Sequence, residues 1–267
     1  MNLINLLQKR AEKENLPFKI ILKESLQFLA LTTIYEDPLS TQITFQGGTC
    51  LRFLYGGIRY SEDLDFVTPL DEKSLNNVFE RIKDILKKKI FILEGEIEMR
   101  IQKKAPKLSR WKIYFMSFRK LFSTSFTIEL ANYPSYTQKI LPLRTPAEVP
   151  SIPFILIRAE SEEEILADKI VAIGGRKYIK GRDIFDIWML VQRNINPDIE
   201  LIRKKLSDYS VSTQKLKNNI ELIQPDIVKR EMSSFLPIHF RRQIESDNYQ
   251  SLTDKVKEIC REILEQL

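Results

Sequence analysis

Several side-chain chemistries are scarce in this chain of 267 residues, and each scarcity excludes a class of protein. Two cysteines and one histidine support neither a disulfide framework nor a zinc cluster, and they argue against histidine-based acid–base chemistry. No apolar run approaches the roughly 20 residues that span a bilayer. The amphipathic start of the chain does not have the pattern of a signal peptide. We therefore expect a soluble, cytoplasmic protein that does not bind membranes.

Positive charge is concentrated in one segment, although the formal net charge is only +6. Between Met99 and Ile128 there is no acidic residue, and aromatic side chains lie among the bases. Such a segment is typical of nucleic-acid binding. Ordinary strands with aromatics inside and lysines outside would give the same pattern, so both interpretations stay open. The basic residues of this block are Arg100, Lys103, Lys104, Lys107, Arg110, Lys112, Arg119 and Lys120.

Two glycines follow a short apolar segment at 43–46 that has the pattern of a buried strand. Gly47 and Gly48 favour a sharp turn in which a ligand can approach the main chain. We expect Thr49 to cap a short helix over 50–55. Backbone N–H groups at a helix start stabilise an anion, so the turn predicts a phosphate site.

Two aspartates follow on a predicted second strand. Side chains two residues apart share one face of a strand, so Asp63 and Asp65 are expected to point together while Leu64 and Phe66 enter the core. A pair of carboxylates beside a phosphate turn is suited to Mg²⁺, which binds one or two carboxylates together with substrate phosphates. The alternative is a surface hairpin whose acids are solvated.

The motifs G-G-T-x-L-R, G-G-x-R and S-E-D-L-D-F in this order resemble those of the AbiEii/AbiGii nucleotidyltransferase toxins. The resemblance implies an α+β, DNA polymerase β-like nucleotidyltransferase core, with a mixed or antiparallel sheet flanked by helices. It assigns Gly47, Gly48, Thr49 and Arg52 to nucleotide binding. It assigns Asp63 and Asp65 to catalysis and to Mg²⁺ or Mn²⁺.

Helical periodicity predicts helices over 2–14, 17–35 and 71–89. Strands are predicted over 91–103, 111–122 and 125–133, in a simple antiparallel order. Glu129 is an isolated acid in the last of these strands. The resemblance makes it a third metal ligand, and the alternative is an exposed position in an ordinary alternating strand.

Five prolines between Pro134 and Pro153 predict a connector. We expect a nucleotidyltransferase domain over 1–150 and a mainly helical domain over 151–267 that contributes to the active-site cleft. Pro153 to Arg158 is predicted as a last strand. Ser161 then begins a helix with a capping box, and four helices are predicted from 198 onward.

Lys169 projects from the apolar stripe of the helix that begins at Ser161, so it should meet a carboxylate, a phosphate or a polar cleft. The alternative is that its stem extends to solvent at the helix edge. A basic loop with two glycines at its start leads into R-D-I-F-D. The resemblance gives Lys169 and Asp183 catalytic roles. It gives Lys169, Arg182 and Asp186 contacts to the nucleotide, while Asp183 alternatively orients Lys169 or Arg182.

The function that this resemblance implies is transfer of a nucleoside monophosphate from an NTP to an acceptor, with a tRNA 3′ end expected. The protein would then be the toxin of a type IV toxin–antitoxin or abortive-infection system active in phage defence, with a cognate antitoxin from a neighbouring gene. The alternatives are a nucleotidyltransferase acting on a protein or small-molecule hydroxyl, and a non-catalytic RNA-binding protein with a retired site.

Overall fold

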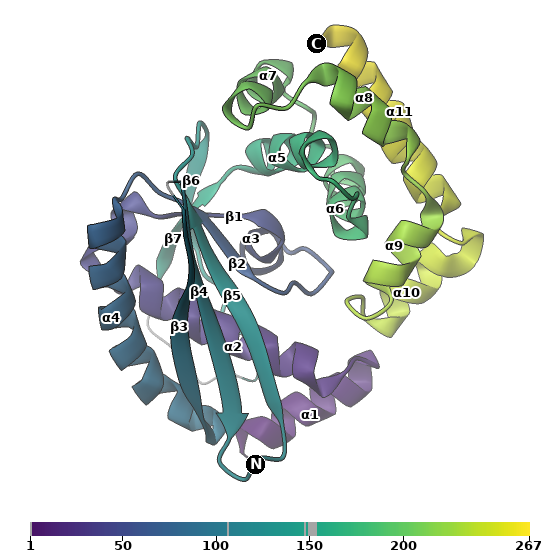
Figure 1. Ribbon diagram of the computed structural model, residues 1–267. Coiled ribbons are helices and arrows are strands. Elements are labelled where there is room, and N and C mark those ends of the chain that lie inside the picture. The colour runs from purple at the N-terminus through teal and green to yellow at the C-terminus, as the bar shows by residue number, and fades with distance from the viewer. Residues whose placement is uncertain (1, 106, 147, 149–153) are drawn as a thin grey trace. The chain divides into compact units, whose positions relative to one another are not determined.

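A computed structural model describes residues 2–105, 107–146, 148 and 154–267 (Figure 1). The chain forms two compact units, and each is described by itself. The first comprises Met1–Gly56 and Tyr60–Ala159, and the second comprises Gly57–Arg59 and Glu160–Leu267. The boundary predicted after residue 150 falls among the residues 149–153, which are outside the described part of the chain.

The first unit is built on a mixed seven-stranded sheet in the order β3-β4-β5-β2-β1-β7-β6. The predicted antiparallel succession β3, β4, β5 is confirmed. β2 pairs parallel with β5 and antiparallel with β1, and β1 pairs parallel with β7. The strands are β1 (Thr44–Gln46), β2 (Leu64–Val67), β3 (Gly95–Ala105), β4 (Leu108–Ser117), β5 (Ser123–Ala131), β6 (Gln138–Pro142) and β7 (Leu156–Glu160).

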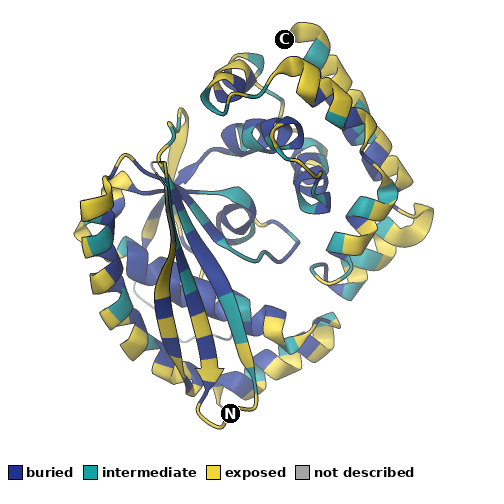
Figure 2. Ribbon diagram, in the orientation of Figure 1, coloured by how far each residue is buried: buried dark blue, intermediate teal, exposed yellow. Residues whose placement is uncertain are grey.

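Helices cover one face of this sheet, as the periodicity predicts. Figure 2 shows α2 buried along almost all of its length, whereas α4 keeps an exposed outer face. Phe79 of α4 lies edge-on to Trp111 of β4, with their ring centroids 5.2 Å apart, so the amphipathic stripe of α4 closes the core. The helices of this unit are α1 (Leu3–Glu14), α2 (Phe18–Tyr35), α3 (Gly47–Leu54) and α4 (Glu72–Lys89), with 3₁₀ turns at Pro38–Gln42 and Ile90–Leu93.

Two local predictions for this unit are wrong. The helix after β1 begins at Gly47 and its N-cap is Gln46, so Thr49 does not cap it. The proline-rich connector contains a strand, β6, which ends at Pro142. β6 lies at the edge of the sheet, where a residue without an N–H removes no central ladder bond, so proline is tolerated there.

The second unit is helical, as expected. α5 packs against α6, α7 and α8, and α6 packs against α9 and α11. Gly174 and Gly175 end α5 as predicted. The short helix α10 is missing from the sequence prediction. The helices are α5 (Glu162–Gly175), α6 (Gly181–Gln192), α7 (Ile199–Asp208), α8 (Thr213–Glu221), α9 (Pro225–Met232), α10 (Ile238–Ile244) and α11 (Gln250–Gln266), with a 3₁₀ turn at Glu245–Asp247.

None of the helices in the described residues combines the length and apolar character needed to cross a membrane.

Candidate active site

Asp65 and Glu129 are register partners on the neighbouring parallel strands β2 and β5. Neighbouring strands lie about 4.8 Å apart, and paired residues share a face, so the two carboxylates stand side by side. Leu64 and Phe66 are fully buried, while Asp65 is half-buried, as the alternation predicts. The fold therefore presents two adjacent acids on the sheet face opposite to the one that α2 and α4 cover.

Gly47 brings the start of α3 close to Asp65. Its φ is +78°, in the left-handed region that favours glycine. A Cβ atom at this position would lie 2.8 Å from Oδ2 of Asp65, closer than real side chains approach. The absence of a side chain at Gly47 thus leaves room for the Asp65 carboxylate beside the N-terminus of α3.

Asp63 is held in place by two threonines just before β2 begins. The Thr49 hydroxyl donates a hydrogen bond to the carbonyl oxygen of Asp63. The backbone N–H of Thr127 donates to Oδ1 of Asp63 at 2.9 Å. Thr49 is therefore part of the support of the acidic segment, and one carboxylate oxygen of Asp63 is already used as a hydrogen-bond acceptor.

Asp65 and Glu129 offer the carboxylate oxygen ligands that Mg²⁺ prefers. Mg²⁺ is held by one or two carboxylates and substrate phosphates, and Asp65 and Glu129 are half-buried oxygen donors on one surface. Glu129 also forms an ion pair with Arg110, with Oε1 and a guanidinium nitrogen 2.6 Å apart. In the described residues, no group of three or more His, Cys, Asp or Glu side chains is arranged to hold a metal by itself. A bound metal would therefore need phosphate ligands as well.

Arg52, expected at the nucleotide, is engaged in a polar cluster beside α2. Its Nε lies 2.7 Å from Oε1 of Glu24, and its guanidinium stacks over the Tyr60 ring at 4.1 Å. Arg10 joins the cluster at 2.8 Å from Oε2 of Glu24, and its Nη2 donates to the Tyr60 hydroxyl at 2.7 Å. These contacts hold the Arg52 side chain within the first unit, and its assignment to the nucleotide stays a prediction.

In the second unit, Lys169 lies between two buried aspartates. Its Nζ is 3.0 Å from Oδ1 of Asp183 and 2.9 Å from Oδ2 of Asp186. Burial alone would lower the pKa of Lys169, but the carboxylates of Asp186 and Asp183 outweigh it and raise the pKa above its ordinary value. The partners expected for this buried lysine are thus two carboxylates of α6.

Two arginines complete this network. Arg59 donates from Nε to Oδ1 of Asp186 at 2.5 Å and from Nη2 to Oδ2 at 2.6 Å. The Nε of Arg176 is 2.9 Å from Oδ2 of Asp183. Burial favours the neutral acids, but these cations and Lys169 hold the pKa values of Asp183 and Asp186 below the ordinary range. Three cations therefore keep both buried carboxylates ionised.

The sequence interpretation missed Arg59 as a site residue. Its signal was present in the G-G-x-R motif, but an arginine in a predicted bend has no periodicity that marks it as buried. It is only 4% exposed. The segment Gly57–Arg59 belongs to the second unit although it lies between α3 and β2 in the chain. Three residues separate Arg59 from Asp63.

Arg182, predicted to bind phosphate, lies at the start of α6, where its backbone N–H donates to Oε2 of Glu231 at 3.3 Å. Its assignment to the nucleotide stays a prediction, as do those of Lys169, Asp183 and Asp186.

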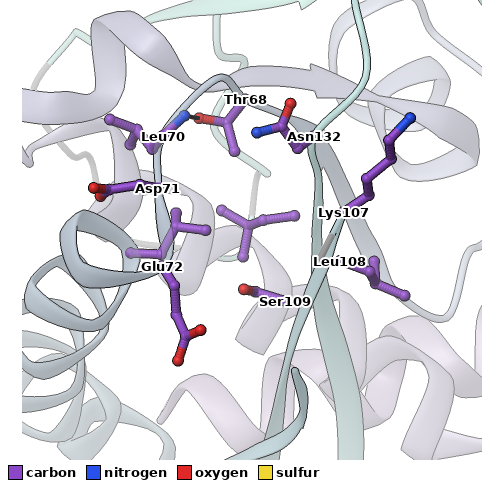
Figure 3. A pocket seen from close by; sticks show the side chains of 10 residues that line it. Thr68, Leu70, Asp71, Glu72, Lys107, Leu108, Ser109 and Asn132 are labelled. Carbon is purple, nitrogen blue, oxygen red and sulfur yellow. Dashed lines mark hydrogen bonds between the residues drawn. The ribbon is translucent and has the colours of Figure 1, made fainter. Parts of the chain in front are cut away.

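A cavity of about 480 Å³ lies at the ends of β2 and β5 and the starts of β4 and α4 (Figure 3). Its wall combines four leucines with polar and charged residues, which are Thr68, Asp71, Glu72, Lys107, Ser109 and Asn132. None of the predicted site residues lines it. The cavity is thus a separate feature, three residues beyond Asp65 along the chain at Thr68.

Known structures share this fold over nearly the whole chain. The nucleotidyltransferase toxin MenT4, Rv2826c of Mycobacterium tuberculosis H37Rv, aligns with a TM-score of 0.62 at 16% identity, covering 98% of this chain and 95% of the other. JHP933 from Helicobacter pylori aligns with a TM-score of 0.57 at 18% identity, covering 94% of each chain. A putative nucleotidyltransferase from H. pylori aligns with a TM-score of 0.56 at 19% identity, covering 94% of this chain and 97% of the other.

A search of curated protein sequences gave no match. The model of the family described as nucleotidyl transferase AbiEii toxin, type IV TA system, matches residues 29–260. The predicted fold class and family are confirmed, and membership of a type IV toxin family implies a cognate antitoxin. The chain belongs to the AbiEii family of nucleotidyltransferase toxins of type IV toxin–antitoxin systems.

Proposed function

We propose that this toxin transfers a nucleoside monophosphate from an NTP to the 3′ hydroxyl of an RNA, with tRNA as the acceptor, and that it requires Mg²⁺ or Mn²⁺. The observation that carries the proposal is the pairing of Asp65 with Glu129 on neighbouring strands, with the glycine start of α3 next to Asp65. Two carboxylates and a helix N-terminus meet there, and these are the groups that bind a metal and a phosphate.

The candidate site residues of the first unit each have a defined role in this proposal. Asp65 and Glu129, with Asp63 as the further predicted ligand, would hold the metal ion together with phosphate oxygens of the NTP. A bound metal ion would neutralise the charge that develops on the phosphate oxygens. The backbone N–H groups at the start of α3, from Gly47 onward, would bind the triphosphate without a charged side chain.

The reaction is an in-line displacement. The acceptor oxygen forms a bond to the α-phosphorus of the NTP, and the bond from the α-phosphorus to the bridging oxygen breaks. Pyrophosphate leaves with that electron pair, and the proton of the acceptor hydroxyl passes to water. Nucleotide binding is also proposed for three residues of the second unit, Lys169, Arg182 and Asp186. Asp183 is proposed to keep the Lys169 ammonium charged and in position.

The basic block of β3 and β4 favours RNA as the acceptor. Tyr114 of this block is 40% exposed and Phe118 is 50% exposed, whereas Trp111 and Phe115 are buried in the core. Arg110 and Lys112 occupy the sheet face that also carries Glu129. A small hydroxylated acceptor would not require basic and aromatic side chains along these strands.

The test is incubation of the purified protein with Mg²⁺, each labelled NTP in turn and total tRNA, followed by electrophoresis. We expect label in the tRNA fraction with the wild type, and none with Asp65→Ala or after chelation of the metal. Label on a protein or a small metabolite would overturn the RNA acceptor. Absence of labelled product with all four NTPs and every acceptor would overturn the catalytic proposal.

A further inference from the structure

The loop between α5 and α6 is unusually basic. Between Gly174 and Arg182 there is no acidic residue, and four basic residues flank one tyrosine and one isoleucine. The basic residues are Arg176, Lys177, Lys180 and Arg182. This density of positive charge in a short surface segment is suited to a polyanion.

The loop is fixed to the rest of its unit. The amide of Asn219 donates to the carbonyl oxygen of Ile173 at 2.7 Å, and Nζ of Lys215 donates to the carbonyl of Gly175 at 3.1 Å. Ile179 is buried. At the other end, a Cβ on Gly181 would lie 2.5 Å from the carbonyl oxygen of Ile227, so the loop packs closely on α9. A loop held in this way presents its remaining side chains in a defined position.

Tyr178 is the large apolar side chain that this loop exposes. It is 68% exposed, although its neighbour Ile179 is buried. The ammonium of Lys177 lies 5.1 Å from the centroid of the Tyr178 ring. Burying an apolar ring is favourable by about 25 cal/mol for each Å² of apolar surface, and an exposed ring does not gain this free energy. A ligand that covers the ring would recover this free energy.

We propose that Tyr178 is a stacking platform for a nucleobase, and that Lys177 and Lys180 bind the phosphates on either side of that base. The ligand class is a nucleotide residue in a single strand. Base stacking on an aromatic ring suits any base, and the flanking ammonium groups suit the phosphodiester backbone. The inference rests on the proposed function in taking nucleotides as ligands, and it names a site outside the predicted motifs.

The charges around the ring are available to such a ligand. The ion pair of Lys180 with Oε1 of Glu231 is long, at 4.0 Å, and the Lys180 side chain is 43% exposed. Arg176 differs, because it is 2.9 Å from Asp183 and belongs to the Lys169 network. The same short loop therefore carries an exposed ring, two lysines and the arginine that pairs with Asp183.

The nucleotide has two possible sources, the acceptor RNA and the NTP, and the experiment separates them. Binding of a fluorescein-labelled single-stranded RNA octamer is measured by anisotropy, and binding of each NTP by calorimetry, both without transfer. We expect Tyr178→Ala to weaken octamer binding roughly tenfold, the effect of losing one stacked base, and Tyr178→Phe to bind within about twofold of wild type. We expect Lys177→Ala to reduce the slope of log affinity against log salt by about one unit.

Tyr178→Trp provides a second readout, because a stacked base quenches indole fluorescence. Phe154→Ala, at an aromatic residue 77% exposed in the other unit, is the control and should bind like wild type. Loss of NTP affinity alone would identify the base of the NTP as the ligand. Unchanged affinity of Tyr178→Ala for both the octamer and the four NTPs would overturn the inference.

The outcome is separable from that of the proposed function. Transfer to tRNA with no effect of Tyr178→Ala on binding or on either KM refutes the stacking site and leaves the transfer intact. Binding that depends on Tyr178 in a protein that transfers nothing supports the stacking site and refutes the transfer.

Discussion

Arg59 and Asp186 form a buried, two-point ion pair in which Nε and Nη2 of the arginine bind the two carboxylate oxygens at 2.5 and 2.6 Å. Both side chains are nearly inaccessible, at 4% and 1% exposure. The same carboxylate also holds Lys169. Arg59 thus fixes the acid that fixes the lysine, and it does so from a segment that leads within three residues to Asp63.

Removal of this arginine should be costly. Arg59→Met leaves Asp186 buried with one cation fewer, and breaking a buried pair typically costs about 3–5 kcal/mol of unfolding free energy. The double variant Arg59→Met/Asp186→Leu should recover part of the loss, which a double-mutant cycle by urea unfolding would measure. Arg261→Met breaks an exposed two-point pair with Glu221 in the same unit and should change stability little. Equal effects of Arg59→Met and Arg261→Met would contradict this role of Arg59.

Gly47 should tolerate alanine less well than Gly56, although both have positive φ. Gly56→Ala has no atom within 4 Å of its new Cβ, so it should cost only the backbone strain, about 1–2 kcal/mol. Gly47→Ala adds a contact of 2.8 Å with Oδ2 of Asp65, and overpacking of this kind adds about 1–3 kcal/mol. Urea unfolding of both variants gives the difference.

The same contact should reduce activity, because the new methyl group must displace the Asp65 carboxylate. We expect Gly47→Ala to lose nucleotidyl transfer under conditions in which it is folded, and Gly56→Ala to retain it. Wild-type activity in Gly47→Ala would show that the position of Asp65 relative to α3 does not matter for the reaction.

The elements that the sequence predicts well are those whose pattern is local. The stripe of α4 and the alternation of Leu64, Asp65 and Phe66 follow from helix and strand periods, and both are confirmed. The edge strand β6 is absent from the sequence prediction because its proline, Pro142, is compatible with an edge position that only the sheet order reveals. The same limit applies to Thr49, whose partner is a carbonyl 14 residues away and not its own helix.

Some features of the candidate site follow from local sequence, and others depend on the fold. The motif stretch 44–67 predicts that a glycine turn and two acids belong together, and Gly47 lies so close to Asp65 that a Cβ on it would be 2.8 Å from Oδ2. The parallel pairing of β2 with β5 brings Glu129 to Asp65, and no local pattern specifies that register. The partners of Arg59 lie 127 residues away, so burial of this arginine could not be inferred without the fold.

A buried cluster around Lys205 predicts an unusual dependence of stability on pH. Lys205 lies 2.7 Å from Glu164 and 3.4 Å from Glu160, and all three are fully buried, with Asp168 at 3.1 Å. Burial and the neighbouring charge of Asp168 raise the pKa of Glu160 well above its ordinary value of 4.5. A carboxyl with a raised pKa in the folded state contributes stability that is complete below pH 4.5 and is lost as the pH rises through the folded pKa.

Glu160→Gln should remove the loss of stability that accompanies ionisation of Glu160, because an amide does not ionise. We expect the variant to gain stability relative to wild type as the pH is raised above about 4.5. Urea unfolding at several pH values would measure this, with Glu258→Gln, an exposed acid of α11, as the control that keeps the wild-type dependence. A difference between Glu160→Gln and wild type that stays constant with pH would rule out the proposed protonation.

Glu129 and Glu98 offer a matched test of the metal assignment on one sheet. Glu129 pairs in register with Asp65, whereas Glu98 lies on β3 with its side chain 57% exposed and pairs with Arg100. If Glu129 contributes to the metal, Glu129→Gln should raise the Mg²⁺ concentration for half-maximal transfer at least about tenfold, the range seen when a metal site loses a supporting group. Glu98→Gln should leave this concentration unchanged.

Both substitutions keep the side-chain volume, and Glu129 is only half-buried, so neither should move Tm by more than a few degrees. The readout is a Mg²⁺ titration of initial transfer rate, repeated with Mn²⁺. An unchanged titration for Glu129→Gln with a lower maximal rate would instead assign this carboxylate to orienting Arg110, its partner at 2.6 Å. The metal would then depend on Asp63 and Asp65 with phosphate oxygens alone.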